Sequence, residues 1–66
     1  MKLDAKKCER IMAENCLDIS GLTEKTGLTF KTVSLTVRGI TEPRAKNMKK
    51  ICEALNCKPV DLLEDK

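Results

Sequence analysis

The turn signals of this sequence divide it into segments that are long enough for short helices and for little else. Gly27, Gly39 and Asn56 each end a segment of helix-forming residues, and each can adopt the left-handed backbone conformation that terminates a helix. The breaks predict helices over residues 4–15, 19–26, 30–38, 44–56 and 59–64. Because Phe30 is the only aromatic residue, a β-sandwich or barrel is disfavoured. We therefore expect an all-α fold, a compact five-helix bundle.

Capping residues and apolar spacing support these boundaries. Asp4, Asp18 and Thr29 precede the first three segments and are good N-caps. Pro43 suits the first turn of the fourth helix or the residue before it. The side chains expected to face the core recur at helical spacing or follow a turn; they are Cys8, Ile11, Met12, Leu22, Leu28, Val33, Ala45, Met48, Ile51, Cys52, Leu55, Val60 and Leu63.

The size of the chain limits its chemistry. Its 66 residues make one domain, residues 1–66, and such a domain buries only about 60% of the surface of its unfolded chain. The chain has no His and no Gly-rich phosphate loop, which removes the usual catalytic pairs. The sequence therefore predicts no enzyme, no cofactor and no small-molecule ligand. Without a long apolar run or a signal peptide, it also predicts a cytoplasmic protein that does not enter a membrane.

Four cysteines, Cys8, Cys16, Cys52 and Cys57, allow three interpretations. Two disulfides would suit a secreted mini-protein, but the helix-forming composition is unlike that of a loop-rich disulfide scaffold. A four-cysteine zinc site is the sharper alternative, and structural zinc sites usually bring their ligands in close pairs. Here seven residues separate the first pair and four separate the second, and no His is present. We expect buried free thiols in a reducing cytoplasm and no bound metal.

Positive charge gathers in the middle of the chain. Residues 25–50 hold seven Lys or Arg and one acidic residue, whereas the segments before and after them are slightly acidic. Such a patch is the footprint expected of a protein that binds a polyanion. The alternative is a solvated, lysine-rich face.

The segment 19–38 is the most informative part of the sequence. Two helices of about eight residues meet at Gly27-Leu28-Thr29, which is the short glycine-containing turn of a DNA-binding helix-turn-helix. Gly27 allows a sharp bend, and Leu22, Leu28 and Val33 are placed to hold the two helices at a fixed angle. The outer face of the second helix is then free to enter the major groove of DNA.

The same segment carries a resemblance to a known family. The run from Leu22 to Thr29 resembles the L-A-x-x-x-G-[VIL]-[ST] core of the Cro and phage-repressor regulators, also called Xre-type regulators. Arg38-Gly39, then Pro43, and the run 51–63 are similar to the closing pattern of small stand-alone bacterial members. The resemblance covers residues 8–64. It implies a lambda-repressor-like DNA-binding domain from a bacterium or a phage.

The sequence departs from the family pattern at three positions. Thr23 stands where the family prefers Ala, in a tight place between the helices. Met12 and Val37 stand where many members carry an Arg and a Glu that pair across the helices. Because both replacements are apolar, they compensate for one another, and we expect the fold to be kept.

The resemblance implies that the second motif helix meets the bases of DNA. The matching positions are Thr29, Phe30, Lys31, Ser34, Leu35 and Arg38. Lys31 can donate to guanine O6 and N7 or to a phosphate, and Thr29 and Ser34 can serve either. Phe30 and Leu35 can contact thymine methyl groups. Alternatively, Phe30 folds back onto the bundle, or the pair forms a protein interface.

Members of the family contact the DNA backbone around the loop proline. The matching positions are Thr41, Arg44, Lys46 and Asn47, and Ser20 near the start of the first motif helix can do the same on the other side. A helix N-terminus adds oriented N–H groups and a partial positive charge. Lys49 and Lys50 are more typical of solvated surface.

One such module makes few base contacts, so tight binding normally needs a homodimer on two half-sites of a palindromic operator. Ile40, Val60, Leu62 and Leu63 are more apolar residues than one short helix can bury. We expect some of them at a two-fold interface; otherwise they cap the core of the monomer. The sequence predicts a sequence-specific transcriptional regulator that acts as a repressor. The alternative is an antitoxin-like interaction module that also binds its own operator.

Overall fold

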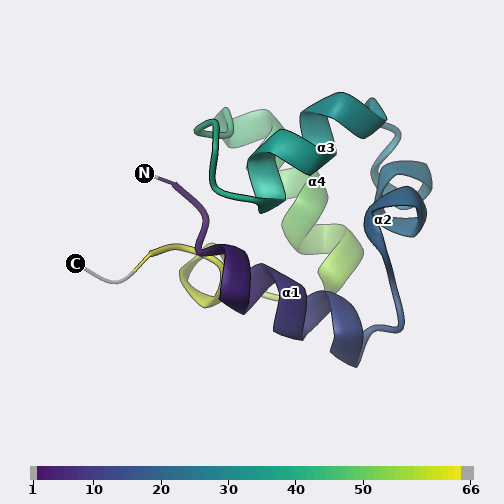
Figure 1. Ribbon diagram of the computed structural model, residues 1–66, viewed down its shortest axis with the longest axis horizontal. Coiled ribbons are helices and arrows are strands. Elements are labelled where there is room, and N and C mark those ends of the chain that lie inside the picture. The colour runs from purple at the N-terminus through teal and green to yellow at the C-terminus, as the bar shows by residue number, and fades with distance from the viewer. Residues whose placement is uncertain (1, 65–66) are drawn as a thin grey trace.

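The computed structural model describes residues 2–64, and within them it contains four α-helices and one short 3-10 helix. These are α1 (Ala5–Glu14), α2 (Ile19–Thr26), α3 (Phe30–Val37), α4 (Ala45–Leu55) and η1 (Pro59–Asp61). In Figure 1, α2 packs against both α3 and α4, α1 lies along α3, and η1 follows the end of α4. The all-α prediction is confirmed. Within that part of the chain no helix is long and apolar enough to cross a membrane.

The prediction of a fifth α-helix over residues 59–64 is wrong. Only one 3-10 turn forms there, because the chain then leaves the helical path and pairs with its own beginning. Leu63 forms an antiparallel bridge with Leu3. The Asp4 N–H donates to the Leu62 carbonyl at 2.7 Å, and the Glu64 N–H donates to the Lys2 carbonyl at 3.1 Å. The segments at the two ends of the described chain, residues 2–4 and 62–64, are thus hydrogen-bonded to each other.

Each of the first three helices begins at the predicted capping residue. Asp4 accepts from the backbone N–H groups of Lys6 and Lys7 at 2.9 and 3.2 Å. Asp18 accepts from the Gly21 N–H at 2.7 Å, and Thr29 from the Thr32 N–H at 3.2 Å. Pro43 lies before Arg44, which is the N-cap of α4, so the proline stands outside the helix. These local contacts set the directions in which the helices leave their turns.

Every α-helix is followed by a residue in the left-handed region. The predicted positions Gly27, Gly39 and Asn56 have φ of 74°, 76° and 52°. Cys16 has φ of 56° and ends α1 in the same manner, although its residue type did not predict this. Position 39 requires glycine for two reasons: its φ is positive, and a Cβ there would lie 2.8 Å from the Leu3 carbonyl oxygen.

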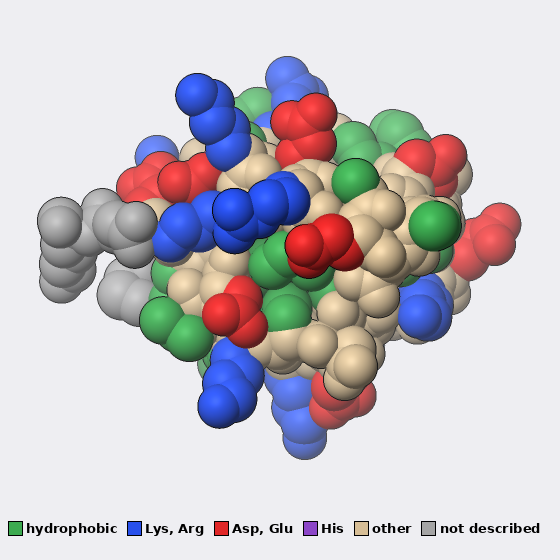
Figure 2. All heavy atoms as spheres, turned by 90° about the horizontal axis from the view of Figure 1, so that it is seen from below, with side chains coloured by type: hydrophobic (Ala, Val, Ile, Leu, Met, Phe, Trp, Pro, Cys, Tyr) green, Lys and Arg blue, Asp and Glu red, His purple; other side chains and the backbone are tan. Residues whose placement is uncertain are grey.

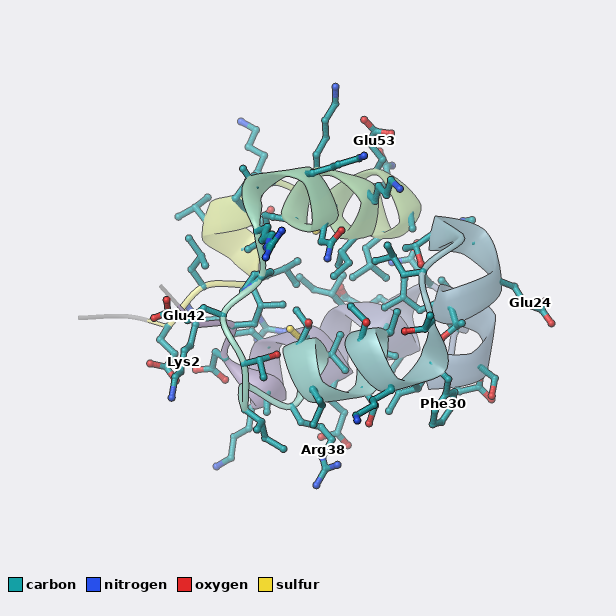
Figure 3. All side chains as sticks on the ribbon, turned by 90° about the horizontal axis from the view of Figure 1, so that it is seen from above. Lys2, Glu24, Phe30, Arg38, Glu42 and Glu53 are labelled. Carbon is teal, nitrogen blue, oxygen red and sulfur yellow. The ribbon has the colours of Figure 1, made fainter. Side chains whose placement is uncertain are left out.

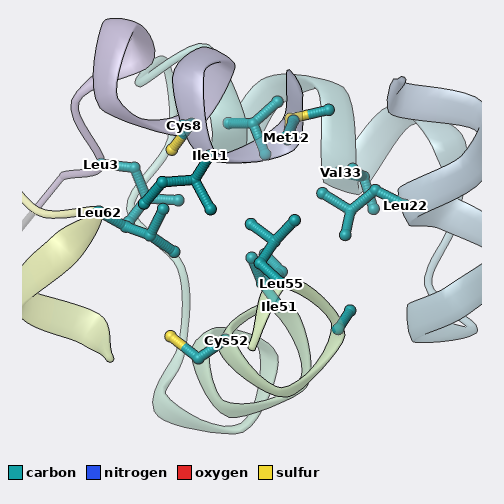
Figure 4. Close-up of a cluster of buried hydrophobic side chains, with 12 residues drawn as sticks. Leu3, Cys8, Ile11, Met12, Leu22, Val33, Ile51, Cys52, Leu55 and Leu62 are labelled. Carbon is teal, nitrogen blue, oxygen red and sulfur yellow. The ribbon is translucent and has the colours of Figure 1, made fainter. Parts of the chain in front are cut away.

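The core lies between the helices and draws on all four α-helices, the end of η1 and the N-terminal segment (Figure 4). Its buried side chains are Leu3, Cys8, Ile11, Met12, Leu22, Val33, Val37, Ile51, Cys52, Ala54, Leu55 and Leu62. Leu28, Met48 and Leu63 are half-buried against it. Burial of both Met12 and Val37 agrees with the apolar exchange expected for that pair.

Two residues expected to face the core do not. Val60 is 68% exposed, and Ala45 in the first turn of α4 is exposed as well. The tighter rotation of the 3-10 turn and the pairing with Leu3 turn Leu62 inward in place of Val60. Leu62 is completely buried.

Candidate DNA interface

Helix α3 is held at the surface by its inner side. Val33, Thr36 and Val37 are buried, and α3 packs against α2 and α1 through this side. Gly27 ends α2 and Thr29 begins α3, with half-buried Leu28 between them. The turn is therefore built as the sequence predicts, and it fixes the angle between the two helices.

The six positions predicted to meet bases all lie at the surface. Thr29, Lys31 and Arg38 are exposed, and Phe30 is 54% exposed. Ser34 and Leu35 are half-buried. In Figure 3, Phe30 and Arg38 project from opposite ends of α3, on the side turned away from α4. The structure thus rules against the alternative in which Phe30 folds back into the bundle.

Two of these residues already have a structural task. The Thr29 hydroxyl donates to the Thr32 hydroxyl at 2.8 Å while it caps α3. The Leu35 carbonyl accepts from the N–H groups of Ile40 and Thr41 at 3.0 and 3.3 Å. Thr32, which orients Thr29, was not among the predicted site residues; the i, i+3 spacing of two threonines in the first turn was the signal that could have found it.

The closing turn of α3 also places Leu35. Its bond with Ile40 across the left-handed Gly39 is the six-to-one bond of a Schellman motif, in which the two end side chains commonly contact each other. The backbone carbonyl of Leu35 thus closes α3, while its side chain is half-buried. Ile40 itself stays 49% exposed.

The predicted phosphate-contacting residues of the loop and α4 are also accessible. Thr41, Arg44 and Lys46 are exposed, and Asn47 is half-buried. Arg44 is the N-cap of α4, and its own side chain makes no capping hydrogen bond. The first turn of α4 therefore lacks the N-cap side-chain bond that α1, α2 and α3 have, and its N–H groups form the positive pole of the helix.

The start of α2 differs from the start of α4. Ser20 is exposed in the first turn, as predicted. However, the carboxylate of Asp18 occupies this N-terminus through its 2.7 Å bond with the Gly21 N–H. A negative group already stands where a phosphate would approach, so Ser20 has a weaker electrostatic basis than Arg44.

Viewed from the side of α1, acidic and basic side chains are mixed around apolar atoms (Figure 2). The basic stretch of the sequence runs from Lys25 in the last turn of α2 through α3 and the loop after it to Lys50 on α4.

The four cysteines differ in their burial. Cys16 is exposed at the end of α1, whereas Cys8 and Cys52 are buried and Cys57 is half-buried. Burial raises the pKa of Cys8 to about 12, with smaller contributions from Asp4 and the other two thiols. In the described residues 2–64, no group of three or more His, Cys, Asp or Glu side chains is arranged to hold a metal ion.

The four apolar residues considered for a dimer interface separate into two groups. Leu62 is buried and Leu63 packs against the core, so these two serve the monomer. Ile40 and Val60 remain exposed, at 49% and 68%.

Comparison with known proteins agrees with this geometry. Residues 7–66 match a family described as the Cro/C1-type HTH DNA-binding domain. The chain is also 31% identical over 55 residues to a Bacillus subtilis (strain 168) protein named "Uncharacterized HTH-type transcriptional regulator YozG". That alignment covers 82% of this chain and 66% of the relative, so the chain spans just under two thirds of the relative's length. No solved structure matches the chain.

The family match spans nearly the whole chain and names a binding function. It confirms the predicted resemblance and the prediction of a DNA-binding domain rather than an enzyme. The chain belongs to the family of Cro/C1-type helix-turn-helix DNA-binding domains.

Proposed function

We propose that this chain is a sequence-specific transcriptional regulator that reads double-stranded DNA with α3 in the major groove. The observation that carries the proposal is the accessibility of the outer side of α3. Lys31 and Arg38 are exposed on it, while its inner side is locked into the bundle by Val33 and Val37. A rigidly held helix with free donors on one face suits base recognition.

The residues of α3 divide by the chemistry that they offer to a base. Lys31 and Arg38 donate to guanine O6 and N7, and the Ser34 hydroxyl pairs with either a donor or an acceptor. Phe30 offers an apolar surface to a thymine methyl group. Thr29 contributes less, because its hydroxyl caps the start of α3, and half-buried Leu35 offers less apolar surface than Phe30.

Backbone contacts come from the loop and the start of α4. Thr41, Arg44, Lys46 and Asn47 lie just before or within the first turn of α4, where the N-cap side chain makes no capping hydrogen bond. A phosphate at this point gains charge-assisted hydrogen bonds and the favourable end of the helix dipole. These contacts position the protein on the duplex and carry no sequence information.

The regulator acts as a homodimer and as a repressor. A single module of this size offers too few base contacts for tight binding, whereas two copies read two half-sites of a palindromic operator. The exposed side chains of Ile40 and Val60 are the apolar surface available for the two-fold contact. Occupancy of an operator excludes other proteins from the same DNA.

The test begins with selection of bound duplexes from random DNA, which yields the preferred site. Lys31→Ala and Ser34→Ala should each weaken binding to that site by about 1–3 kcal/mol more than binding to random DNA. Lys6→Ala removes an equal charge from an exposed position on α1 and should leave the difference unchanged. Fluorescence anisotropy with both DNAs measures each affinity.

Equal losses of affinity on both DNAs for Lys31→Ala and Ser34→Ala would refute base reading by α3. If no site emerges from the selection, the antitoxin-like alternative is favoured, and the 54% exposed Phe30 becomes the first position to test for protein contact.

A further inference from the structure

The end of α4 brings two cysteines together through backbone geometry. Asn56 adopts the left-handed conformation, with φ 52° and ψ 49°. The Cys57 N–H then donates to the Cys52 carbonyl at 3.1 Å, and the Asn56 N–H donates to the Glu53 carbonyl at 3.3 Å. This pair of bonds defines a Schellman motif, whose two end residues usually carry apolar side chains in contact. Here both end residues are cysteine.

The two thiols are near neighbours: burial raises both pKa values, and the interaction between the thiols makes the pKa of Cys52 lower and the pKa of Cys57 higher than burial alone would. Both residues line a groove of about 470 Å³ between α4 and η1, together with Met48 and Pro59. Because Cys57 is half-buried and Cys52 is only 6% exposed, a reagent in the groove meets Cys57 first.

The other two cysteines are placed differently. Cys8 projects from α1 on the other side of the core cluster from Cys52 (Figure 4), and it is 1% exposed. Cys16 is exposed on the turn after α1. Neither of them shares a helix cap with another thiol.

We propose that Cys52 and Cys57 form a dithiol site that reacts with small-molecule disulfides and closes into an intramolecular disulfide. The Cys57 thiolate attacks one sulfur of the reagent R–S–S–R, which forms a mixed disulfide and expels R–S⁻. The Cys52 sulfur then attacks the Cys57 sulfur, which forms the protein disulfide and expels the second R–S⁻. The protein loses two electrons and two protons, and the reagent gains them as two R–SH.

Both cysteines of this site are free thiols. Burial raises the pKa of Cys57 to about 11, with further contributions from Cys52 and Asp61, and burial also raises the pKa of Cys52. Thiols rather than thiolates therefore prevail at neutral pH, so the attack by Cys57 is slow there and becomes faster as the pH rises toward 11. Closure of the bond would covalently fix the cap of α4.

The experiment uses the full chain in the Cys16→Ser background, which removes the exposed thiol that would otherwise form adducts. The folded protein is incubated with excess oxidised glutathione and its intact mass is measured. We expect this mass to fall by the mass of two hydrogen atoms, with no glutathione adduct left on the protein. Alkylation under denaturing conditions should then label Cys8 alone, and cleavage after Glu53 should leave two fragments joined through sulfur.

Two further variants identify the partners. Cys8→Ala in the same background should still form the disulfide, because Cys8 takes no part. Cys57→Ser should abolish it. A disulfide that includes Cys8 would overturn the proposal. An unchanged mass would also overturn the proposal if Cys16 of the unaltered chain forms a glutathione adduct under the same conditions.

Discussion

The two ends of α4 differ in how their terminal backbone groups are hydrogen-bonded. At the C-terminal end, each of the last four carbonyl groups has a partner: Cys57 and Asn56 supply backbone N–H groups to residues 52 and 53. The Lys25 ammonium donates to the Ala54 carbonyl at 3.1 Å, and the Asn15 amide donates to the Leu55 carbonyl at 3.2 Å. At the N-terminal end, Arg44 offers no side-chain cap to the first N–H groups.

This difference separates stability from binding within one helix. The C-terminal end of α4, which we call the closed end, ties α4 to α1 through Asn15 and to α2 through Lys25. It thus anchors the helix-turn-helix to the rest of the bundle. At the N-terminal end, which we call the open end, the N–H groups of the first turn and the positive pole of the helix can serve a ligand. Changes at the closed end should therefore alter the free energy of unfolding, and changes at the open end should alter the affinity for DNA.

The largest effect should come from an apolar truncation at the closed end. Leu55 is 2% exposed, so Leu55→Ala should lower the free energy of unfolding by about 2–5 kcal/mol. Met48→Ala, nearer the open end, removes a half-buried side chain and should cost clearly less. Urea denaturation followed by helical circular dichroism compares the two variants. Equal decreases would contradict the assignment of stability to the closed end.

Alkaline pH should weaken the packing of α1 against the core. Burial, with smaller contributions from Asp4, Cys57 and Cys52, raises the pKa of Cys8 from its ordinary value of 9.0 to about 12. A raised folded-state pKa contributes stability that is complete below about pH 9 and is lost as the pH rises to 12. The free energy of unfolding should therefore fall across this window more steeply in the unaltered chain than in Cys8→Ala. Cys16→Ala, at an exposed thiol, should keep the steep fall.

A smaller effect is expected from the lysine that caps the closed end. Lys25→Ala removes the donor to the Ala54 carbonyl and should cost about 1 kcal/mol of unfolding free energy. Lys49→Ala removes the same side chain from an exposed position of α4 and should change stability by less than about 0.5 kcal/mol. Indistinguishable midpoints of urea unfolding for the two variants would show that the Lys25 bond contributes nothing.

The open end should respond in the reverse direction. Serine is a preferred N-cap, so Arg44→Ser should raise the free energy of unfolding by up to about 1 kcal/mol while it weakens DNA binding. Denaturation and anisotropy titrations on the same preparation measure both quantities. A variant that gains stability and keeps full affinity would separate the open cap from DNA binding.

Local chemistry made most of the helices predictable. Asp4, Asp18 and Thr29 were identified because an N-cap depends only on the residues that follow it. The two glycine stops were identified for the same reason. The turn at Cys16 was not, since a cysteine with φ of 56° gives no signal in composition.

Contacts between distant parts of the chain were not predictable. The bridge between Leu3 and Leu63 joins the two ends of the described chain, and it determines that Leu62 rather than Val60 enters the core. No periodicity in residues 59–64 contains that information. In the candidate site, an exposed face on α3 was predictable from the sequence, whereas the capping tasks of Thr29 and Leu35 and the carboxylate beside Ser20 were not.

The most direct test of phosphate binding at the open end is the salt dependence of DNA binding by Arg44→Ala, with Arg10→Ala as its matched control. Arg10 is likewise an exposed arginine, and it lies on α1, away from the open end of α4. We predict that Arg44→Ala weakens binding to preferred and random DNA alike and reduces the slope of log K against log salt by about 0.9 for each phosphate that the variant no longer neutralises. Arg10→Ala should leave the slope unchanged. An unchanged slope for Arg44→Ala, or an equal reduction for both variants, would contradict phosphate binding at the start of α4.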